Sequence, residues 1–133
     1  MENNLAKDPL GHVKLSVSDF KKSYSFYVDL FTQLGFTQIS YKDNKAGWVT
    51  LGGFGIWISQ AVIKEPTYIF SAPGIHHLCI KARSREEVDS VYEWIKNTTQ
   101  VFNLPQAYPQ YTSKYYAVFF SDLDGIKLEV AYY

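Results

Sequence analysis

The sequence predicts an α+β protein built from two copies of one strand–helix–strands unit. An internal repeat is the first observation behind this prediction, because His12 and His77 lie 65 residues apart (77 − 12) and other residues match at the same spacing. Such self-similarity at a fixed offset indicates a duplicated structural unit. Each copy also contains one helical apolar pattern followed by several alternating strand patterns. The further matches are Leu15 with Ile80, Ser25 with Ser90, Tyr27 with Tyr92, and Leu30 with Ile95.

Each copy contains one segment with the apolar spacing of an amphipathic helix. The first helix is expected to run roughly over residues 20–34, with Asp19 or Ser18 as N-cap and Gly35 just past its end. The second helix opens with the capping-box sequence Ser84-Arg-Glu-Glu87. Both helices should press one apolar stripe onto a sheet. The stripes consist of Phe20, Tyr24, Tyr27, Phe31 and Leu34 in the first helix, and of Val88, Val91 and Ile95 in the second.

Strands are predicted where apolar and polar residues alternate between turn-forming residues. In the first copy we expect them within residues 10–17, 37–41, 46–51 and 55–59, and in the second around 77–82, 115–121 and 126–132. Turns are expected at Asp43-Asn44, at Gly52-Gly53 and over residues 122–125. Residues 102–113 contain two prolines, and we expect a loop there that holds at most one short strand.

Composition indicates one domain of two modules. A chain of 133 residues with 47% hydrophobic residues is long and apolar enough to bury a single substantial core. We expect module one over about residues 10–60, a linker over about 61–74, and module two over about 75–133. This linker is long enough for the modules to pair within one chain or to exchange between two chains.

Charge and hydropathy exclude several kinds of partner. The thirteen basic residues balance thirteen acidic ones, so we expect no nucleic-acid partner and no binding to an anionic membrane. One cysteine excludes an internal disulfide. The sequence has no apolar run near the roughly 20 residues of a membrane span. The polar start Met1-Glu-Asn-Asn4 lacks the features of a signal peptide, so we expect a cytoplasmic protein.

Two histidines and one glutamate fall on the polar faces of predicted strands. With a period of two, His12, His77 and Glu129 each lie opposite the apolar side chains of their own strand. His76 shares the parity of the apolar Leu78 and is the weaker candidate. Two imidazoles and one carboxylate can hold one divalent metal ion with open coordination positions. A lone histidine at the start of a strand is more often structural, so the prediction depends on convergence of all three.

Several motifs together resemble one protein family. They are Gly11-His-Val-Lys-Leu-Ser-Val-Ser-Asp19, Ser25-Phe-Tyr27, Leu34-Gly-Phe36, His76-His-Leu-Cys-Ile80 and Phe119-Phe-Ser-Asp-Leu-Asp-Gly-Ile-Lys-Leu-Glu129. They resemble the vicinal oxygen chelate superfamily, which includes glyoxalase I, bleomycin-resistance proteins and extradiol dioxygenases. The resemblance implies two βαβββ modules that form a partly closed mixed sheet around a metal cavity, usually in a homodimer. It matches the family's metal ligands with His12, His77 and Glu129.

The resemblance also implies an activity. We expect a metal-dependent lyase, isomerase or dioxygenase that acts on a small oxygenated substrate chelated through two vicinal oxygens. Its cofactor would be one divalent ion of zinc, manganese, nickel, cobalt or iron, and Glu129 would act as both ligand and catalytic base. The alternative is a non-catalytic protein of the bleomycin-resistance type that sequesters a ligand.

Departures from the family pattern affect the ligand count. Some relatives take a fourth ligand from the last strand of the first module. If Gly55 corresponds to Gly125, Ser59 lies opposite Glu129 and supplies no strong ligand, although Gln60 is one register step away. We therefore expect three protein ligands plus water.

Substrate contacts are also predicted. Tyr115 ranks first, because it shares parity with Ala117 and Phe119, positions that the resemblance implies face the cavity. Lys14 shares a face with His12, and Trp57 is one of the aromatic residues expected to line the pocket. A lysine in the cavity would favour an anionic substrate such as a carboxylate or a phosphate. Cys79 shares the face of His77, and we expect it to be a buried, inert thiol.

Overall fold

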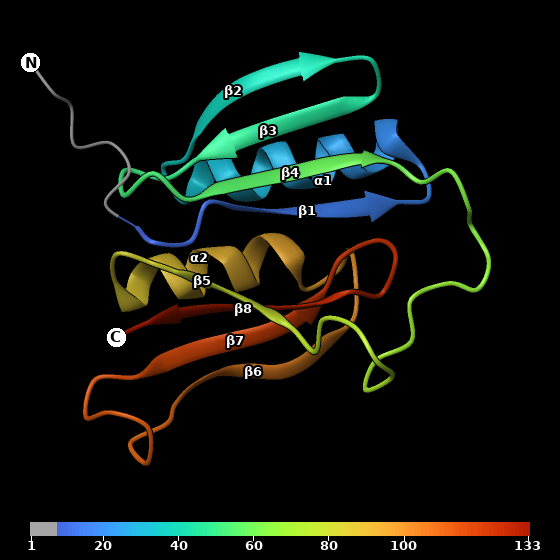
Figure 1. The fold of residues 1–133 in the computed structure, drawn as a ribbon. Coiled ribbons are helices and arrows are strands. Elements are labelled where there is room, and N and C mark those ends of the chain that lie inside the picture. The colour runs from blue at the N-terminus through green and yellow to red at the C-terminus, as the bar shows by residue number, and fades with distance from the viewer. Residues whose placement is uncertain (1–7) are drawn as a thin grey trace, which may run out of the picture. The chain divides into compact units, whose positions relative to one another are not determined.

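The computed structural model describes residues 8–133 and divides the chain into two compact units, Met1–Glu65 and Pro66–Tyr133. Residues 1–7, including the polar start on which the cytoplasmic prediction partly depends, lie outside the described part. Each unit contains one helix and one four-stranded mixed sheet, as Figure 1 shows. The expected α+β fold of two βαβββ modules is confirmed. Between residues 8 and 133, neither helix is long and apolar enough to cross a membrane.

Unit one follows the order strand, helix and three strands. Its sheet has the strand order β1-β4-β3-β2, in which β1 runs parallel to β4 and the other neighbours are antiparallel. In Figure 1, α1 lies behind this sheet. The elements are β1 (His12–Val17), α1 (Phe20–Gln33), β2 (Thr37–Lys42), β3 (Lys45–Val49) and β4 (Gly55–Gln60).

Helix α1 begins and ends where its sequence predicts. The carboxylate of Asp19 accepts a hydrogen bond from the backbone N–H of Lys22 at 3.2 Å, which makes Asp19 rather than Ser18 the N-cap. After the helix, Gly35 adopts a φ of 79°, a left-handed conformation that suits glycine. The predicted stripe is buried except for the partly exposed Tyr24. Its buried members are Phe20, Tyr27, Phe31 and Leu34.

The hairpin between β2 and β3 turns through two residues. Asp43 and Asn44 have φ values of 54° and 58°, the left-handed pair that a two-residue hairpin of this twist requires. The register between β2 and β3 shifts between Gln38 and Ser40, which marks a bulge in the outer strand.

Unit two repeats the same order of elements. Its sheet has the strand order β5-β8-β7-β6, with β5 parallel to β8 and the other neighbours antiparallel. Its elements are β5 (Leu78–Lys81), α2 (Arg85–Ile95), β6 (Val101–Ala107), β7 (Tyr116–Ser121) and β8 (Lys127–Tyr132).

Helix α2 is held at its start by a network of hydrogen bonds. The Ser84 hydroxyl accepts from the backbone N–H of Glu87 at 3.1 Å, as a capping box requires. The Glu87 carboxylate reaches back to the backbone N–H of Arg83 at 2.7 Å and also pairs with its guanidinium. The predicted apolar stripe of Val88, Val91 and Ile95 is fully buried.

The expectation of a mainly loop-like segment over residues 102–113 is wrong in its first half. Residues Val101–Ala107 form strand β6, seven residues long, at the edge of the sheet. An edge strand tolerates Pro105 because it needs only one row of backbone hydrogen bonds. Most side chains of β6 are exposed and its register with β7 shifts twice, so the sequence lacks a period of two.

The turn between β7 and β8 is built on one buried carboxylate. Asp122 is 2% exposed, and its Oδ1 accepts from the backbone N–H groups of Asp124 and Ile126, both at 2.8 Å. Gly125 has a φ of 86°. These bonds confirm the predicted turn and fix where β8 begins.

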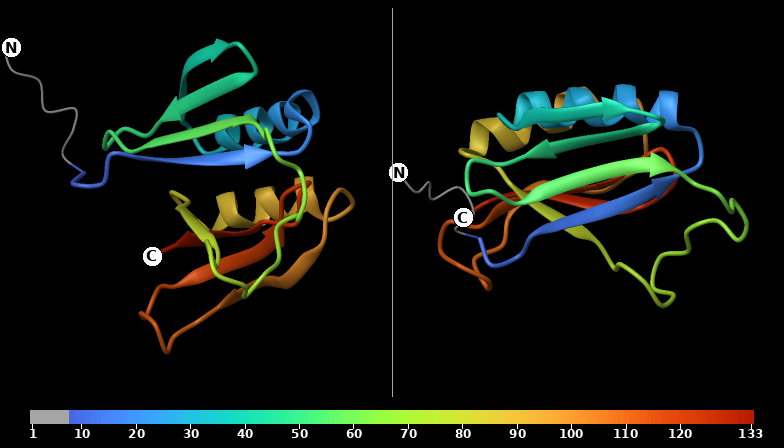
Figure 2. Two further views of the ribbon diagram at one scale, coloured as in Figure 1. Left: turned by 45° about the vertical axis from the view of Figure 1, so that its right-hand side comes forward. Right: turned by 45° about the horizontal axis from the view of Figure 1, so that its top comes forward.

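Each helix covers only one face of its own sheet, as the two views of Figure 2 show. In unit one α1 packs on β3 and β4, and in unit two α2 packs on β6, β7 and β8. Alternate residues of each strand therefore point either into the helix-side core or toward the helix-free face. The candidate residues within strands alternate with the buried helix-side residues and so occupy the helix-free faces; they are His12, Lys14, Trp57 and Glu129.

Candidate functional site

In unit two, His77 and Glu129 lie side by side. Strands β5 and β8 run in parallel with Cys79 paired to Glu129, so the residue two positions before Cys79 borders the same part of β8. The Nε2 atom of His77 lies 3.2 Å from Oε1 of Glu129. Glu129 is only 3% exposed, whereas the His77 side chain keeps 32% of its surface accessible. The pair thus combines a buried carboxylate with an accessible imidazole.

Tyr115 holds the second oxygen of the same carboxylate. Its hydroxyl donates a hydrogen bond to Oε2 of Glu129 at 2.5 Å. The ring of Tyr115 stacks on Tyr133 with centroids 4.6 Å apart and an angle of 10°. Burial, followed by the hydrogen bond to Glu129, raises the pKa of Tyr115, so the phenol remains a proton donor at neutral pH. Glu129 is therefore oriented from both sides.

His76 contacts the other nitrogen of His77. The two Nδ1 atoms lie 2.8 Å apart, so one ring donates and the other accepts. His76 is exposed and packs edge-on against Phe70 at 4.6 Å. Both histidines precede β5, which begins at Leu78, so the strand parity expected from the sequence applies to neither of them. The weaker candidate of the pair therefore contacts the stronger one.

These residues line one hollow of about 390 Å³ in unit two. Lys127 extends one wall, and its ammonium lies over three aromatic rings, those of Phe70 at 4.8 Å, Phe119 at 5.0 Å and Phe102 at 5.5 Å. Such contacts hold a cation without neutralising it. The lining residues are His76, His77, Tyr111, Tyr115, Phe119, Lys127 and Glu129.

We expected Cys79 to be buried, but the residue is exposed. Partial burial of its thiol, followed by the charge of Glu129, raises the pKa of Cys79 to about 12. A thiol with this pKa stays protonated at neutral pH and is a poor nucleophile.

The His77 and Glu129 pair fits a metal ion in its chemistry and spacing. Imidazole nitrogen and carboxylate oxygen bind zinc at about 2.0–2.2 Å, so two such ligands on one ion stand roughly 3.0–3.4 Å apart. The observed separation of 3.2 Å lies in this range. Within residues 8–133, no group of three or more His, Cys, Asp or Glu side chains forms a metal site. Unit two therefore supplies two of the three predicted ligands.

The third predicted ligand lies in unit one. His12 begins β1, is exposed, and pairs in register with Gly55 of β4. A Cβ atom on Gly55 would approach the Cβ of His12 to 3.1 Å, so the glycine leaves room for the start of the His12 side chain. Lys14 pairs with Trp57 on the same strands. Unit one thus collects His12, Lys14 and Trp57 on its helix-free face, whereas His77, Glu129 and Tyr115 meet in unit two.

The register also corrects which residue of unit one corresponds to Glu129. Lys14 pairs with Trp57 as Cys79 pairs with Glu129, so Trp57 is the equivalent of Glu129, and Ser59 is not. An indole does not bind divalent metals, and β4 therefore offers no ligand at the position that corresponds to Glu129.

Sequence reasoning missed the roles of His76, Tyr133 and the aromatic rings around Lys127. The role of His76 was indicated in the sequence by its position directly before His77. The other contacts join Phe70, near the start of unit two, to residues on β6, β7 and β8, and no local pattern indicates such contacts.

Comparison with known families gives one match over most of the chain. The sequence profile of the Glyoxalase/Bleomycin resistance protein/Dioxygenase superfamily matches residues 9–130. A curated relative, the catechol-2,3-dioxygenase of Bacillus subtilis (strain 168), is 30% identical over 95 residues, and the match covers 66% of this chain. The match covers only 31% of that relative, so this chain corresponds to about a third of its length.

Solved structures share the fold at low sequence identity. A candidate glyoxalase from Bacillus halodurans superposes with a TM-score of 0.81 at 24% identity, over 98% of this chain and 100% of that chain. A glyoxalase/bleomycin resistance protein from Albidiferax ferrireducens T118 gives 0.76 at 21% identity, over 95% and 99%. A glyoxylase/bleomycin resistance protein/dioxygenase domain from Frankia sp. EAN1pec gives 0.74 at 23%, over 94% and 91%. At these identities the likeness shows the fold alone.

Proposed function

Because the chain belongs to the Glyoxalase/Bleomycin resistance protein/Dioxygenase superfamily, we propose that it is a metal-dependent enzyme acting on a small molecule with two adjacent oxygen atoms. The observation that supports this most strongly is the 3.2 Å approach of His77 Nε2 to Glu129 Oε1 at the edge of a hollow. A structural ion pair would need no hollow beside it, whereas a catalytic site needs room for a substrate.

In this proposal His77 and Glu129 hold one divalent ion, and His12 is the third ligand. His12 is included on sequence grounds, because it occupies the same position in the repeat as His77. Zinc, manganese, nickel, cobalt and iron are all compatible with two imidazoles and one carboxylate. Such an ion polarises substrate oxygens and lowers the pKa of bound water.

The residues around the pair prepare it for this role. Tyr115 occupies Oε2 of Glu129, which leaves Oε1 free. When the Nδ1–H group of a neutral His77 donates a hydrogen bond to Nδ1 of His76, the Nε2 atom of His77 presents a lone pair toward Glu129. A lone pair facing a carboxylate at 3.2 Å is repulsive unless a cation lies between them. In this proposal the hydrogen bond to His76 selects the metal-binding tautomer of His77.

Lys127 gives the hollow a fixed positive charge. Its three aromatic neighbours hold the ammonium at the wall, and residues 8–133 offer it no ion pair. A preorganised cation stabilises negative charge that develops on a substrate oxygen. Glu129 then accepts or returns the substrate proton, and an anionic substrate is favoured.

Dioxygenase chemistry is the first reaction to test. The printed name of the curated relative is catechol-2,3-dioxygenase, and two histidines with one carboxylate suit ferrous iron. Lyase and isomerase reactions of the same family are the next candidates.

A non-catalytic binding protein is the second candidate. An aromatic cluster around the hollow favours it, because stacked rings can hold a planar ligand without turnover. The cluster consists of Tyr108, Tyr111, Tyr115, Phe119 and Tyr133. A ligand that is protected without being converted to product, to the same extent when His77 is replaced, would favour the binding protein.

Metal titration tests the proposal directly. Untagged protein is purified without chelator, analysed for metals, and titrated calorimetrically with zinc, manganese and ferrous ions. We expect about one equivalent of one ion, and losses of affinity above about 100-fold in His77→Ala and in Glu129→Gln. Glu86→Gln, an exposed glutamate on α2, is the matched control and should bind as the unchanged protein does. Folded protein that contains no metal and takes up none would overturn the metal site.

Tyr115→Phe tests the orientation of Glu129. Removing the phenol hydroxyl deletes its hydrogen bond to Oε2 while the ring keeps its stacking. We expect metal affinity to fall by about 10-fold to 100-fold. Tyr92→Phe, on α2, should leave the affinity unchanged. Equal affinities in the two variants would contradict the orienting role.

We also propose that the two units form a single folding domain, and that the protein is a cytoplasmic homodimer. One cooperative unfolding transition would support the first statement. A light-scattering mass of one chain would contradict the dimer.

A further inference from the structure

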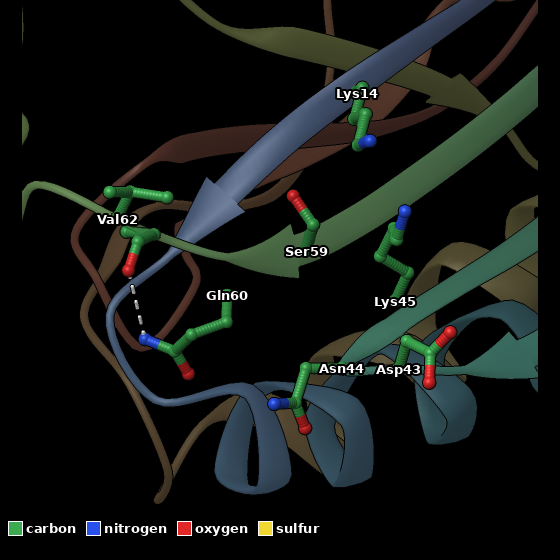
Figure 3. A pocket seen from close by; sticks show the side chains of 8 residues that line it. Lys14, Asp43, Asn44, Lys45, Ser59, Gln60 and Val62 are labelled. Atoms are coloured by element: carbon green, nitrogen blue, oxygen red, sulfur yellow. Dashed lines mark hydrogen bonds between the residues drawn. The ribbon is translucent and has the colours of Figure 1, made fainter.

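We propose that the helix-free face of the unit-one sheet binds an anionic group, a carboxylate or a phosphate, between Lys14, Lys45 and Ser59. A hollow of about 360 Å³ lies there, and its lining shares no residue with that of the hollow that contains Glu129. Figure 3 shows the side chains of Lys14, Lys45 and Ser59 turned toward a common space. The hollow is lined by Lys14, Asp43, Asn44, Lys45, Ser59, Gln60, Ala61 and Val62.

The sheet register brings these side chains together from three strands. Lys45 of β3 lies directly opposite Ser59 of β4, and Ser59 lies directly opposite Ser16 of β1. Lys14 precedes Ser16 by two residues and therefore points to the same face. Two ammonium groups and one hydroxyl thus approach one point from both sides of β4. This is a donor arrangement that suits a compact oxyanion.

The charges on this face are not balanced within the described part of the chain. Lys42 lies directly opposite Lys45 across the β2–β3 hairpin, and like charges in this position repel each other. None of Lys14, Lys42 and Lys45 forms an ion pair with residues 8–133, and Asp43 is the only acidic residue that lines the hollow. A bound anion would relieve this repulsion.

The floor of the hollow is fixed by backbone contacts. The side chain of Gln60 accepts from the backbone N–H of Phe20 at 2.9 Å and donates to the carbonyl of Ser18 at 2.9 Å. The Gln60 N–H donates to the carbonyl of Asn44 at 3.0 Å, which ties the hairpin tip to the end of β4. The lysines therefore extend from a braced turn and strand rather than from a free loop.

This site extends the function proposed above, on which its role as a substrate subsite depends. His12 lies on β1 two residues before Lys14 and on the same face. At about 3.3 Å per strand residue, Lys14 stands roughly 7 Å along the strand from His12. Ser59, opposite Ser16, stands roughly 13 Å along it. The substrate class is then a small molecule whose carboxylate or phosphate lies about 7–13 Å along β1 from the end that binds at His12.

Titration with small anions tests this site in the full chain. Amide spectra of ¹⁵N-labelled protein are followed during separate additions of inorganic phosphate and acetate. We expect the amide resonances of Lys14, Lys45 and Ser59 to shift until they saturate. The anion that binds more tightly shows whether the site prefers a phosphate or a carboxylate. Lys14→Gln and Lys45→Gln should each weaken phosphate binding by about 5-fold, because each removes one charge-assisted hydrogen bond to the anion.

Two matched variants separate a site from general surface charge. Lys21→Gln removes the same charge from the exposed surface of α1 and should leave phosphate affinity unchanged. Asp43→Asn removes the one nearby negative charge, keeps a residue that tolerates a positive φ, and should tighten phosphate by about 2-fold to 3-fold. Equal phosphate affinities in Lys14→Gln, Lys45→Gln and Lys21→Gln would overturn the anion site.

Metal titration of the same variants distinguishes this inference from the proposed function. Lys45→Gln should retain full metal affinity, and His77→Ala should retain full phosphate affinity. Phosphate binding without any metal uptake would overturn the metal centre and leave the anion site standing. Metal uptake with phosphate binding that is insensitive to Lys14 and Lys45 would overturn only the anion site.

Discussion

The two units share a scaffold but differ on the helix-free face of the sheet. On the helix side, Ile56 and Leu128 occupy equivalent positions and are 2% and 0% exposed, and Ile58 and Val130 are both fully buried. On the helix-free side, Trp57 of unit one corresponds to Glu129 of unit two. Packing against a helix accepts only apolar residues of suitable volume, whereas the other face is free to vary. The chemistry of the chain therefore lies where the two copies diverge.

The difference extends to the size of neighbouring side chains. Gly47 pairs with Trp57 in unit one, and Phe119 pairs with Glu129 in unit two. A Cβ atom on Gly47 would meet the indole of Trp57 at 2.6 Å, so the ring lies directly over the glycine. One unit thus combines a small residue with a large ring, and the other combines a large ring with a carboxylate.

The largest expected effect tests the equivalence of the two cores. Leu128→Ala and Ile56→Ala should each lower the free energy of unfolding by about 2–5 kcal/mol, because each creates a cavity at a fully packed position. Chemical denaturation measures both. Leu123→Ala, at a leucine that is 43% exposed in the β7–β8 turn, should cost much less. A large loss in only one unit would show that the helix-side faces are not equivalent.

A smaller effect is expected from the glycine under the indole. Gly47→Ala should lower the free energy of unfolding by about 1–3 kcal/mol, because the new methyl group collides with Trp57. The cost should shrink when Trp57→Ala is also present, and a double-mutant cycle measures this coupling. Gly52→Ala, whose Cβ would lie 3.8 Å from its nearest neighbour, is the control. If the unfolding free-energy costs of Gly47→Ala and Trp57→Ala simply added, the packing of the Trp57 ring would not depend on Gly47.

The smallest expected effect on stability concerns a difference between the first turns of the two helices. Helix α1 has no acidic residue in its first turn, whereas α2 has Glu86 and Glu87. Burial acts to raise the pKa of Glu87, but hydrogen bonds and charge from Arg83 outweigh it and hold this pKa below its ordinary value of 4.5. A depressed pKa means that Glu87 stabilises the fold above about pH 4.5, and that this contribution disappears as the pH falls through the lower folded value.

Thermal unfolding at several pH values checks this contribution. At pH 7, Glu87→Gln should lower Tm by about 2 °C, and the difference from the unchanged protein should fade below pH 4. Glu86→Gln has no such partner among the hydrogen bonds at the helix start and should show a smaller difference at pH 7. A difference that persists undiminished at pH 3 would contradict the assignment to the Glu87 carboxylate.

Much of the fold followed from local patterns, because both helices and most strands have one buried face. The same alternation put Glu129 on the face opposite Leu128 and Val130, and His77, which lies just before β5, contacts it at 3.2 Å. It failed for β6, whose side chains are mostly exposed and follow no period. Matching Gly55 with Gly125 also failed. Gly55 begins β4, whereas Gly125 lies in the turn before β8. The match therefore made Ser59 the equivalent of Glu129, two residues after the correct residue, Trp57.

The outer strands β2 and β6 have a consequence for how the protein behaves at high concentration. Both edges are irregular, β2 through its bulge and β6 through Pro105 and two register shifts. A straight, regular edge offers unpaired backbone groups to the edge of another molecule and can start aggregation. Lys42 adds a repelling charge beside the β2 hairpin. The imperfections that hid β6 from sequence reasoning therefore protect these two edges from open-ended sheet growth.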